Sequence, residues 1–152
     1  MRVRQIAVVA TALISLFITF APSGNASGVP SNKAPHRIIS LSPSATEDLF
    51  AIGAGKQVIA VDSYSNFPAN APTSKLDAFT PNVEAIAKYK PDLVVLQSSA
   101  TKAASVKASL EKLKIKVFYE VTPTNLEGAY AEITALGSVT GNTNGASQTL
   151  KK

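Results

Sequence analysis

The sequence predicts an α/β fold, a Rossmann-like lobe in which a mostly parallel β-sheet is covered by helices on both faces. Two observations indicate this fold class. After residue 36, apolar segments of strand length alternate with helical patterns, and each strand is followed by a helix before the next strand begins. Such alternation favours right-handed crossovers between parallel strands. The chain has 152 residues, which suits one compact domain.

The first 26 residues are interpreted as a signal peptide, residues 1–26. Met1 to Arg4 is basic, Gln5 to Phe20 is almost continuously apolar, and small residues surround Ala26, a pattern typical of cleaved secretory signals. An uncleaved membrane anchor is the alternative, but the apolar run is shorter than the roughly 20 residues that span a bilayer. A polar linker is predicted over residues 27–35.

The composition limits the possible functions. The chain has no cysteine, which excludes a disulfide, a thiolate metal site, a thiol nucleophile and lipid attachment through cysteine. The net charge of +5 falls to +3 without Arg2 and Arg4, and the remaining lysines are scattered, so nothing indicates nucleic-acid binding. We therefore expect a monomer that is periplasmic or secreted and is not a lipoprotein.

The first strand and the first helix are predicted at residues 37–41 and 45–52. The strand segment is apolar, and the following segment has apolar residues at helical spacing. Ser44 is the predicted N-cap of this helix. This cap would place Glu47 and Asp48 in the first turn, where the helix dipole favours carboxylates.

A second strand and a long loop come next. Gly53 and Gly55 are predicted to end the first helix, because glycine adopts the left-handed conformation common at helix C-termini. The second strand is predicted at residues 57–61. Residues 62–79 contain two prolines and several Asn and Ser residues without sustained periodicity, so we expect an ordered loop with a functional role.

The second helix is predicted to open at Thr80, whose hydroxyl would cap it, with Pro81 at its first helical position. An apolar stripe continues to Tyr89. Pro91 separates this helix from a continuously apolar third strand at residues 93–96, a pattern typical of a buried parallel strand.

The strand and helix pattern then repeats. Residues 103–113 are predicted to be a helix, residues 115–121 the fourth strand, and residues 127–139 the fourth helix, because apolar residues recur at intervals of three or four in both helical segments. The last residues, 142–152, are polar and are predicted to be a tail and the point at which a longer protein is truncated.

Nothing in the sequence indicates catalysis, a cofactor or a metal. The segment 53–56 follows a helix and lacks a third glycine, so it matches neither a dinucleotide-binding nor a phosphate-binding loop. His36 is the only histidine and has no partner nucleophile nearby in the sequence. Glu47 and Asp48 are adjacent and point in different directions on a helix. We therefore expect no enzyme activity, no cofactor and no metal site.

Several motifs, in contrast, keep the order and mutual spacing of a known family. They are RIISLSPSATE at residues 37–47, GAG at 53–55, VIAVD at 58–62, YSNFP at 64–68, FTPNVEAI at 79–86 and KPDLVV at 90–95. This series resembles the amino-terminal lobe of the class III periplasmic binding proteins, which serve iron-siderophore, haem and cobalamin import. The lobe is assigned to residues 36–141.

The resemblance implies two lobes joined by a long helix, with the ligand held between them by loops at the carboxyl ends of the strands. Capping is an alternative role for the two serines of the first loop, and Phe67 competes with Tyr64 as the stacking aromatic residue. The implied ligand-binding residues are Ser42, Pro43, Ser44, Tyr64, Phe79, Thr80, Gln97 and Ser98.

Glu84 is implied to dock on the membrane permease, with an ordinary helix-dipole role as its alternative. Corrinoid binders of the family often carry tryptophan near Phe79 and Gln97, and this chain has none. Only Lys75 and Lys102 lie near the candidate loops, so a neutral chelate such as a ferric hydroxamate is mildly preferred.

The implied function is that of the solute-binding component of an ABC importer, which delivers a ferric siderophore, haem or cobalamin to an inner-membrane permease. The second lobe of the family is missing from this sequence, and a truncated fragment is the preferred explanation. The alternative is a secreted single-lobe protein that docks on a permease or another partner without carrying solute.

Overall fold

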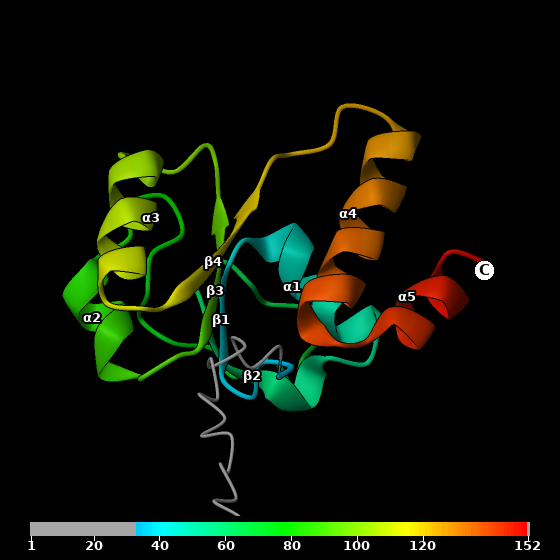
Figure 1. Cartoon of the computed structure of the whole chain (residues 1–152), viewed down its shortest axis with the longest axis horizontal. Coiled ribbons are helices and arrows are strands. Elements are labelled where there is room, and N and C mark those ends of the chain that lie inside the picture. The colour runs from blue at the N-terminus through cyan, green and yellow to red at the C-terminus, as the bar shows by residue number, and fades with distance from the viewer. Residues whose placement is uncertain (1–32, 152) are drawn as a thin grey trace, which may run out of the picture. The chain divides into compact units, whose positions relative to one another are not determined.

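The structure is a computed structural model that describes residues 33–151 (Figure 1). The predicted signal peptide and most of the predicted linker lie outside the described residues, and the domain boundaries stay predictions. Within residues 33–151, no helix combines the length and the apolar character needed to cross a membrane.

Four parallel strands form the sheet, in the order β2-β1-β3-β4. Val94 of β3 pairs with Ile39 of β1 on one side and with Val117 of β4 on the other. Every residue of the two central strands is buried, as expected for a parallel sheet covered on both faces. The strands are β1 (Ile38–Leu41), β2 (Val58–Val61), β3 (Leu93–Gln97) and β4 (Lys116–Glu120).

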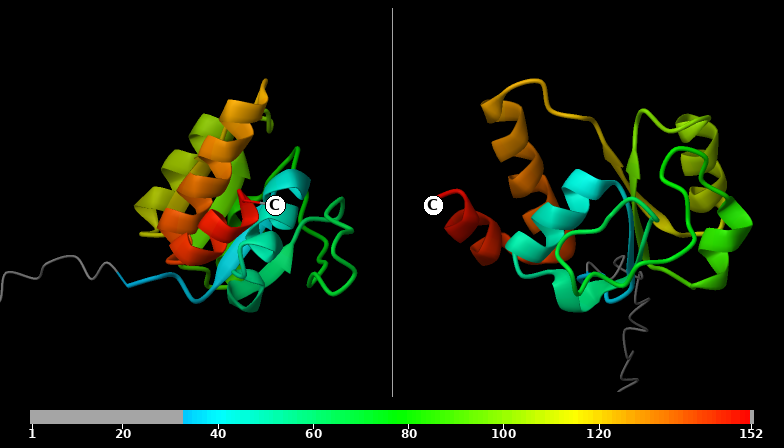
Figure 2. Two further views of the ribbon diagram at one scale, coloured as in Figure 1. Left: turned by 90° about the vertical axis from the view of Figure 1, so that its right-hand side faces the viewer. Right: turned by 180° about the vertical axis from the view of Figure 1, so that it is seen from behind.

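The helices cover both faces of this sheet. Helices α2 and α3 lie on one face, and α1, α4 and α5 lie on the other (Figures 1 and 2). The predicted fold class is therefore confirmed. The helices are α1 (Pro43–Ala51), α2 (Val83–Lys88), α3 (Ala103–Lys112), α4 (Leu126–Thr140) and α5 (Thr143–Thr149), and a short 3-10 helix, η1 (Gly55–Gln57), precedes β2.

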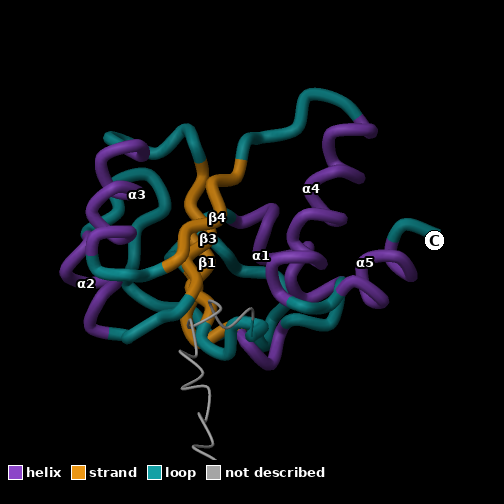
Figure 3. Tube along the Cα trace, viewed as in Figure 1, coloured by secondary structure: helices purple, strands orange, loops and turns teal. Residues whose placement is uncertain are grey.

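Each face of the sheet has its own hydrophobic cluster. Side chains alternate along a strand, so Val94 and Leu96 of β3 pack under α2 and α3, whereas Leu93 and Val95 pack under α1, α4 and α5. Figure 3 shows the strands running through the middle of the molecule between the two helical layers. The carboxyl ends of all four strands therefore lie at one edge, between these layers.

The first helix begins earlier than the sequence analysis predicted. Ser42 is its N-cap, since the Ser42 Oγ accepts the N–H of Ala45 at 3.4 Å and Pro43 takes the first helical position. The first turn consequently contains no acidic residue. The predicted capping role of Ser44 and the predicted first-turn positions of Glu47 and Asp48 were wrong.

The second helix begins later than predicted. Its N-cap is Asn82, whose Oδ1 accepts the N–H of Ala85 at 2.9 Å. The N–H of Thr80, the predicted cap, instead donates to Oδ1 of Asp77 at 2.9 Å. Because Asp77 organises a turn at this point, Thr80 stays outside the helix.

The residues predicted to be a polar tail contain α5. Gly141, with a φ of 77°, ends α4 in the left-handed conformation, and α5 then packs against α1 and α4 through the buried Ala146. A side chain at Gly145 would overlap the carbonyl oxygen of Ile52. The helix packs through Gly145 and the buried Ala146 and has no apolar stripe. Apolar periodicity therefore could not predict it.

Candidate functional site

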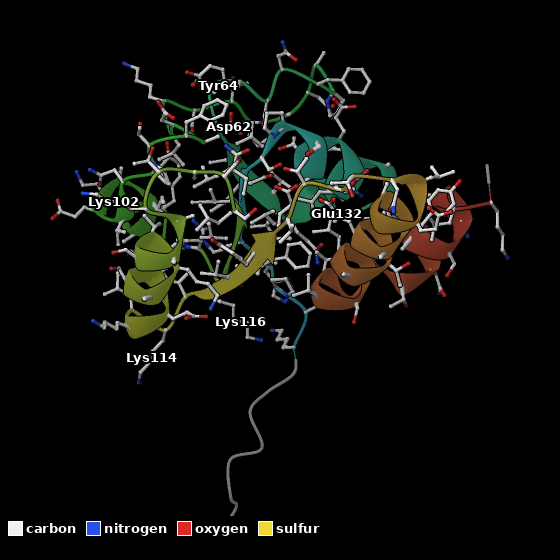
Figure 4. All side chains as sticks on the ribbon, turned by 90° about the horizontal axis from the view of Figure 1, so that it is seen from above. Asp62, Tyr64, Lys102, Lys114, Lys116 and Glu132 are labelled. Carbon is white, nitrogen blue, oxygen red and sulfur yellow. The ribbon has the colours of Figure 1, made fainter. Side chains whose placement is uncertain are left out.

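The candidate site lies at the carboxyl edge of the sheet. Figure 4 looks onto this edge, where Asp62 and Tyr64 lie on the loop after β2 and Lys102 lies just before α3. Loops at the carboxyl ends of parallel strands are the usual place for ligands in open α/β sheets. Four segments meet here: residues 42–44, 62–82, 98–102 and 121–125.

The segment after β1 divides into a buried and an exposed part. Ser42 is 1% exposed, and its Oγ lies 3.1 Å from that of Ser44. Pro43 is half-buried and Ser44 is exposed. The structure therefore gives Ser42 a capping role, and it leaves Ser44 as the serine of this segment whose side chain a ligand can reach.

Two exposed aromatic rings meet on the long loop. Tyr64 and Phe79 are about half exposed, and their ring centroids lie 5.2 Å apart at an interplanar angle of 75°. This edge-to-face geometry is a favourable one for aromatic pairs. The pair brings two of the predicted site residues together. Phe67 is more exposed, at 60%, and is not part of this pair.

A buried polar network positions Tyr64, and the sequence analysis did not identify it. The carboxylate of Asp62, fully buried at the end of β2, accepts the N–H of Tyr64 at 2.8 Å and the hydroxyl of Ser65 at 2.6 Å. The Ser65 Oγ lies 3.1 Å from Oγ1 of Thr46 on α1. The available signal was a lone aspartate directly after an apolar strand, a position typical of turns that bind their own backbone.

The other end of the loop is fastened to the segment after β3. The side chain of Gln97, 8% exposed, donates to the carbonyl of Ala78 at 3.1 Å, and the N–H of Thr101 donates to the carbonyl of Phe79 at 2.7 Å. Gln97 therefore supports the loop with its amide. Ser98 is half-buried, and its N–H donates to the carbonyl of Glu120 at 2.7 Å.

The turn before α2 presents Thr80 to solvent. Asp77 accepts the N–H groups of Thr80 and Phe79 through one oxygen, at 2.9 and 2.7 Å. Both backbone bonds lower the pKa of Asp77, and the bond from Thr80 makes the larger contribution. The ionised Asp77 thus holds the two predicted site residues Phe79 and Thr80 in one turn.

Glu84 lies apart from these residues. It is exposed in the first turn of α2, the short helix on the opposite face of the sheet from α1 (Figure 1). Within residues 33–151, no group of three or more histidine, aspartate or glutamate side chains has the arrangement of a metal site.

Comparison with known proteins places this fold in a family. A family model described as "Periplasmic binding protein" matches residues 38–152. The vitamin B12-binding protein of Yersinia pestis (strain Pestoides F) is 34% identical over 108 residues, which cover 68% of this chain and 37% of that protein. The chain thus spans little more than a third of the length of the curated relatives it matches.

Solved structures share the architecture. A possible iron-binding (periplasmic solute-binding) protein from Staphylococcus epidermidis has a TM-score of 0.70 and 30% identity, over 76% of this chain and 46% of that one. The periplasmic vitamin B12 binding protein of Vibrio cholerae has a TM-score of 0.68 and 28% identity, over 78% and 46%. The chain therefore belongs to the periplasmic binding protein family, the class III solute-binding proteins of ABC importers, which are binding proteins and not enzymes.

Proposed function

We propose that this chain forms one wall of a binding site for a ferric siderophore, haem or cobalamin, and that it presents this ligand to an ABC permease. The observation that carries the proposal is the exposed aromatic pair of Tyr64 and Phe79 at the carboxyl edge of the sheet. Large rings offer contact area to a flat or bulky chelate at a small cost in conformational entropy.

The rigidity of the loop supports this role. Asp62 holds the backbone of Tyr64, and Gln97 holds the backbone beside Phe79. Both rings are therefore fixed through their main chains while their faces stay in solvent. A preorganised surface loses little entropy when a ligand binds.

The charge of the edge supports a neutral or weakly charged ligand. Lys102 is an exposed cation at the edge, and Lys75 is exposed on the long loop, so the edge offers no arginine cluster for a strongly anionic chelate. The names of the relatives, two vitamin B12-binding proteins and a possible iron-binding protein, point to the same group of ligands.

The proposal also includes how the chain delivers its ligand and where it acts. We infer that Glu84, exposed on α2, contacts the permease, and that the chain acts in the periplasm or as a secreted protein after removal of residues 1–26. Glu84→Gln should weaken binding to the permease reconstituted in vesicles and leave ligand binding unchanged. Equal permease binding by Glu84→Gln and the parent chain would remove the docking role.

The first test is isothermal titration of the folded chain with cyanocobalamin, a ferric hydroxamate and haem. We expect saturable binding of at least one of them, weakened about 10- to 30-fold in Tyr64→Ala, the loss typical of a central aromatic contact. Tyr89→Ala is the matched control, because Tyr89 is a partly exposed tyrosine beside the amino end of β1, where its carbonyl accepts from Arg37. A folded sample that binds none of the three ligands would overturn solute binding by this chain and favour a docking protein that carries no solute.

A further inference from the structure

Cations that are scattered along the sequence gather at the amino edge of the sheet, opposite the candidate site. All four strands run parallel, so the helix ends and turns that lead into β3 and β4 lie at this edge. Figure 4 shows Lys114 and Lys116 near the start of β4, on the other side of the view from Asp62 and Tyr64. Seven exposed cations form this surface, which we call the basic edge: Lys33, Arg37, Lys88, Lys90, Lys112, Lys114 and Lys116.

Hydrogen bonds join the segments that carry these cations. The guanidinium group of Arg37, just before β1, donates to the carbonyl of Lys90 at 2.9 Å. The carbonyl of Arg37 accepts the N–H of Asp92 at 3.0 Å, and the carbonyl of Asp92 accepts the N–H of Lys116 at 3.3 Å. The starts of β1, β3 and β4 are therefore tied to one another, and their cations share one surface.

Two cavities open between the lysines at the start of β4. Lys33 and Lys116 line a cavity of about 500 Å³ against the end of α4, and no acidic residue lines it. Lys114 and Lys116 line a second cavity, of about 350 Å³, together with Glu111. Because an ammonium group is a common partner of phosphate, the first cavity suits a phosphate-bearing group.

Three acids lie near the basic edge and leave it positively charged. Asp92 accepts two backbone N–H groups, each at 3.0 Å. Glu111 pairs with Lys107 at 2.8 Å, the only ion pair among the described residues. Glu84 lies one helical turn from Lys88 on α2. Seven cations thus outnumber three acids, and this surface attracts an anionic partner.

The helix ends explain only part of this charge. A lysine in the last turn of a helix interacts favourably with the dipole, which accounts for Lys88 and Lys112. Lys90 and Lys114 come one residue after the C-caps of α2 and α3, with φ values of 51° and 61°. Glycine is unstrained in this left-handed conformation and lysine is not. The basic edge therefore carries cations even where the backbone conformation favours glycine.

Exposed apolar side chains lie between these lysines. Residues 88–90 are Lys-Tyr-Lys and residues 112–114 are Lys-Leu-Lys, and Tyr89 and Leu113 are 36% and 54% exposed. Lysines beside an exposed Tyr or Leu are typical of a surface that rests on lipid, where ammonium groups contact phosphates and apolar side chains enter the acyl boundary. A nucleic acid offers phosphates but no apolar layer for Leu113.

We propose that the basic edge binds the surface of membranes that contain anionic phospholipids, with the lysines at the phosphate groups and Tyr89 and Leu113 at the boundary of the acyl chains. Only residues 21–32 separate Lys33 from the apolar run of the predicted signal peptide, so export brings this edge to a membrane. Binding of this kind is reversible and weakens as salt screens the charges. It involves neither the solute nor the permease, so its test is independent of the proposed function.

The first test is cosedimentation of the full chain with phosphatidylcholine vesicles, with and without phosphatidylglycerol. Residues 1–32 are the same in every variant, so differences between variants report on the basic edge. Lys114→Gly should weaken binding to the phosphatidylglycerol vesicles about fivefold, and Lys90→Gly combined with Lys114→Gly about 25-fold, at roughly fivefold for each lysine. Both variants should melt at or above the temperature of the parent, because glycine suits left-handed positions. Loss of charge is thereby separated from loss of structure.

Lys102→Gly is the matched control, because Lys102 is an exposed lysine in the same left-handed conformation, with a φ of 56°, at the opposite edge of the sheet. It should change vesicle binding by less than about twofold, since its charge lies far from the lipid. Equal losses in Lys102→Gly and Lys114→Gly, or equal binding of the parent to both kinds of vesicle, would overturn the proposal.

A second test separates a bilayer from a soluble polyanion. Leu113→Ala should weaken binding to phosphatidylglycerol vesicles about 3- to 10-fold, because less apolar surface enters the bilayer, and should leave binding to single-stranded DNA unchanged. Leu126→Ala is the control, because Leu126 is a leucine 60% exposed at the start of α4, and it should bind vesicles like the parent. A Leu113→Ala variant that binds vesicles as tightly as the parent would refute a bilayer as the partner.

Discussion

At the scale of single residues, Asp62 links the fold to the candidate site. Asp62 directly follows β2 and is fully buried. Its two carboxylate oxygens accept hydrogen bonds from the N–H of Tyr64 and the hydroxyl of Ser65. Its neighbour Ser65 lies against Thr46 of α1. One charged side chain therefore joins the aromatic loop to the first helix, through hydrogen bonds that water does not reach.

Asp62→Asn is expected to cost about 1–3 kcal/mol of unfolding free energy, because a charge-assisted acceptor is lost in a buried site. The amide of Tyr64 should exchange faster with solvent in the variant. Urea unfolding and hydrogen exchange measure the two effects. Ser63→Ala, at an exposed neighbouring position, is the control, and equal stability of the two variants would contradict the role of Asp62.

At the scale of elements, the start of α2 shows that two residues can have the sequence features of an N-cap while only one of them caps the helix. Thr80-Pro81 and Asn82 both have the composition of a helix start. The structure selects Asn82 because the carboxylate of Asp77 binds the N–H of Thr80. The sequence alone could not show which of Thr80 and Asn82 caps the helix, because a third residue, Asp77, decides between them.

The two candidates differ in their expected cost on removal. Asn82→Ala should destabilise the chain by about 1 kcal/mol through loss of the bond to the Ala85 N–H. Thr80→Ala should cost less than about 0.5 kcal/mol, since its side chain is exposed and caps nothing. Denaturant unfolding of the two variants side by side decides the matter, and a larger loss for Thr80→Ala would restore the predicted cap.

The α5 helix makes the same point with glycine. Gly145 lies so close to the carbonyl of Ile52 that any side chain would collide with it. Gly145→Ala should therefore displace α5 and cost about 1–3 kcal/mol, as overpacking does, although alanine is the better helix former. Ser147→Ala, exposed on the same helix, should be neutral or slightly stabilising. A Gly145→Ala variant as stable as the parent in urea would show that α5 does not pack against α1.

At the scale of the whole molecule, the sequence predicted the architecture better than the site. The four strands, the long loop and the helices near 103–113 and 127–139 were predicted nearly at their observed positions, because hydrophobic periodicity reports burial directly. The motifs identified both Tyr64 and Phe79 as site residues, and the structure brings their rings together. The motifs did not indicate the contact between Thr46 and Ser65 behind Tyr64, because residues 19 positions apart along the chain meet only when the fold is complete.

The two hydrophobic clusters share one sheet, and this predicts how the molecule unfolds. Leu110 lies in the cluster under α3 and Leu136 in the cluster under α4, and both are fully buried. Strands β1 and β3 contribute alternate residues to both clusters. Loss of packing on one face of the sheet therefore destabilises the strands on which the other cluster packs. A small domain built in this way is expected to unfold in one cooperative transition.

Leu110→Ala and Leu136→Ala should therefore each cost about 2–5 kcal/mol and move a single transition that is reported alike by far-ultraviolet circular dichroism and by tyrosine fluorescence. Leu113→Ala is the matched control, because Leu113 is 54% exposed and its removal should cost less than about 1 kcal/mol. Hydrogen exchange then compares the two faces. If Leu136→Ala released α4 and α5 while α3 kept the protection of the parent chain, the faces would be separate folding units, and the shared strands would not couple them.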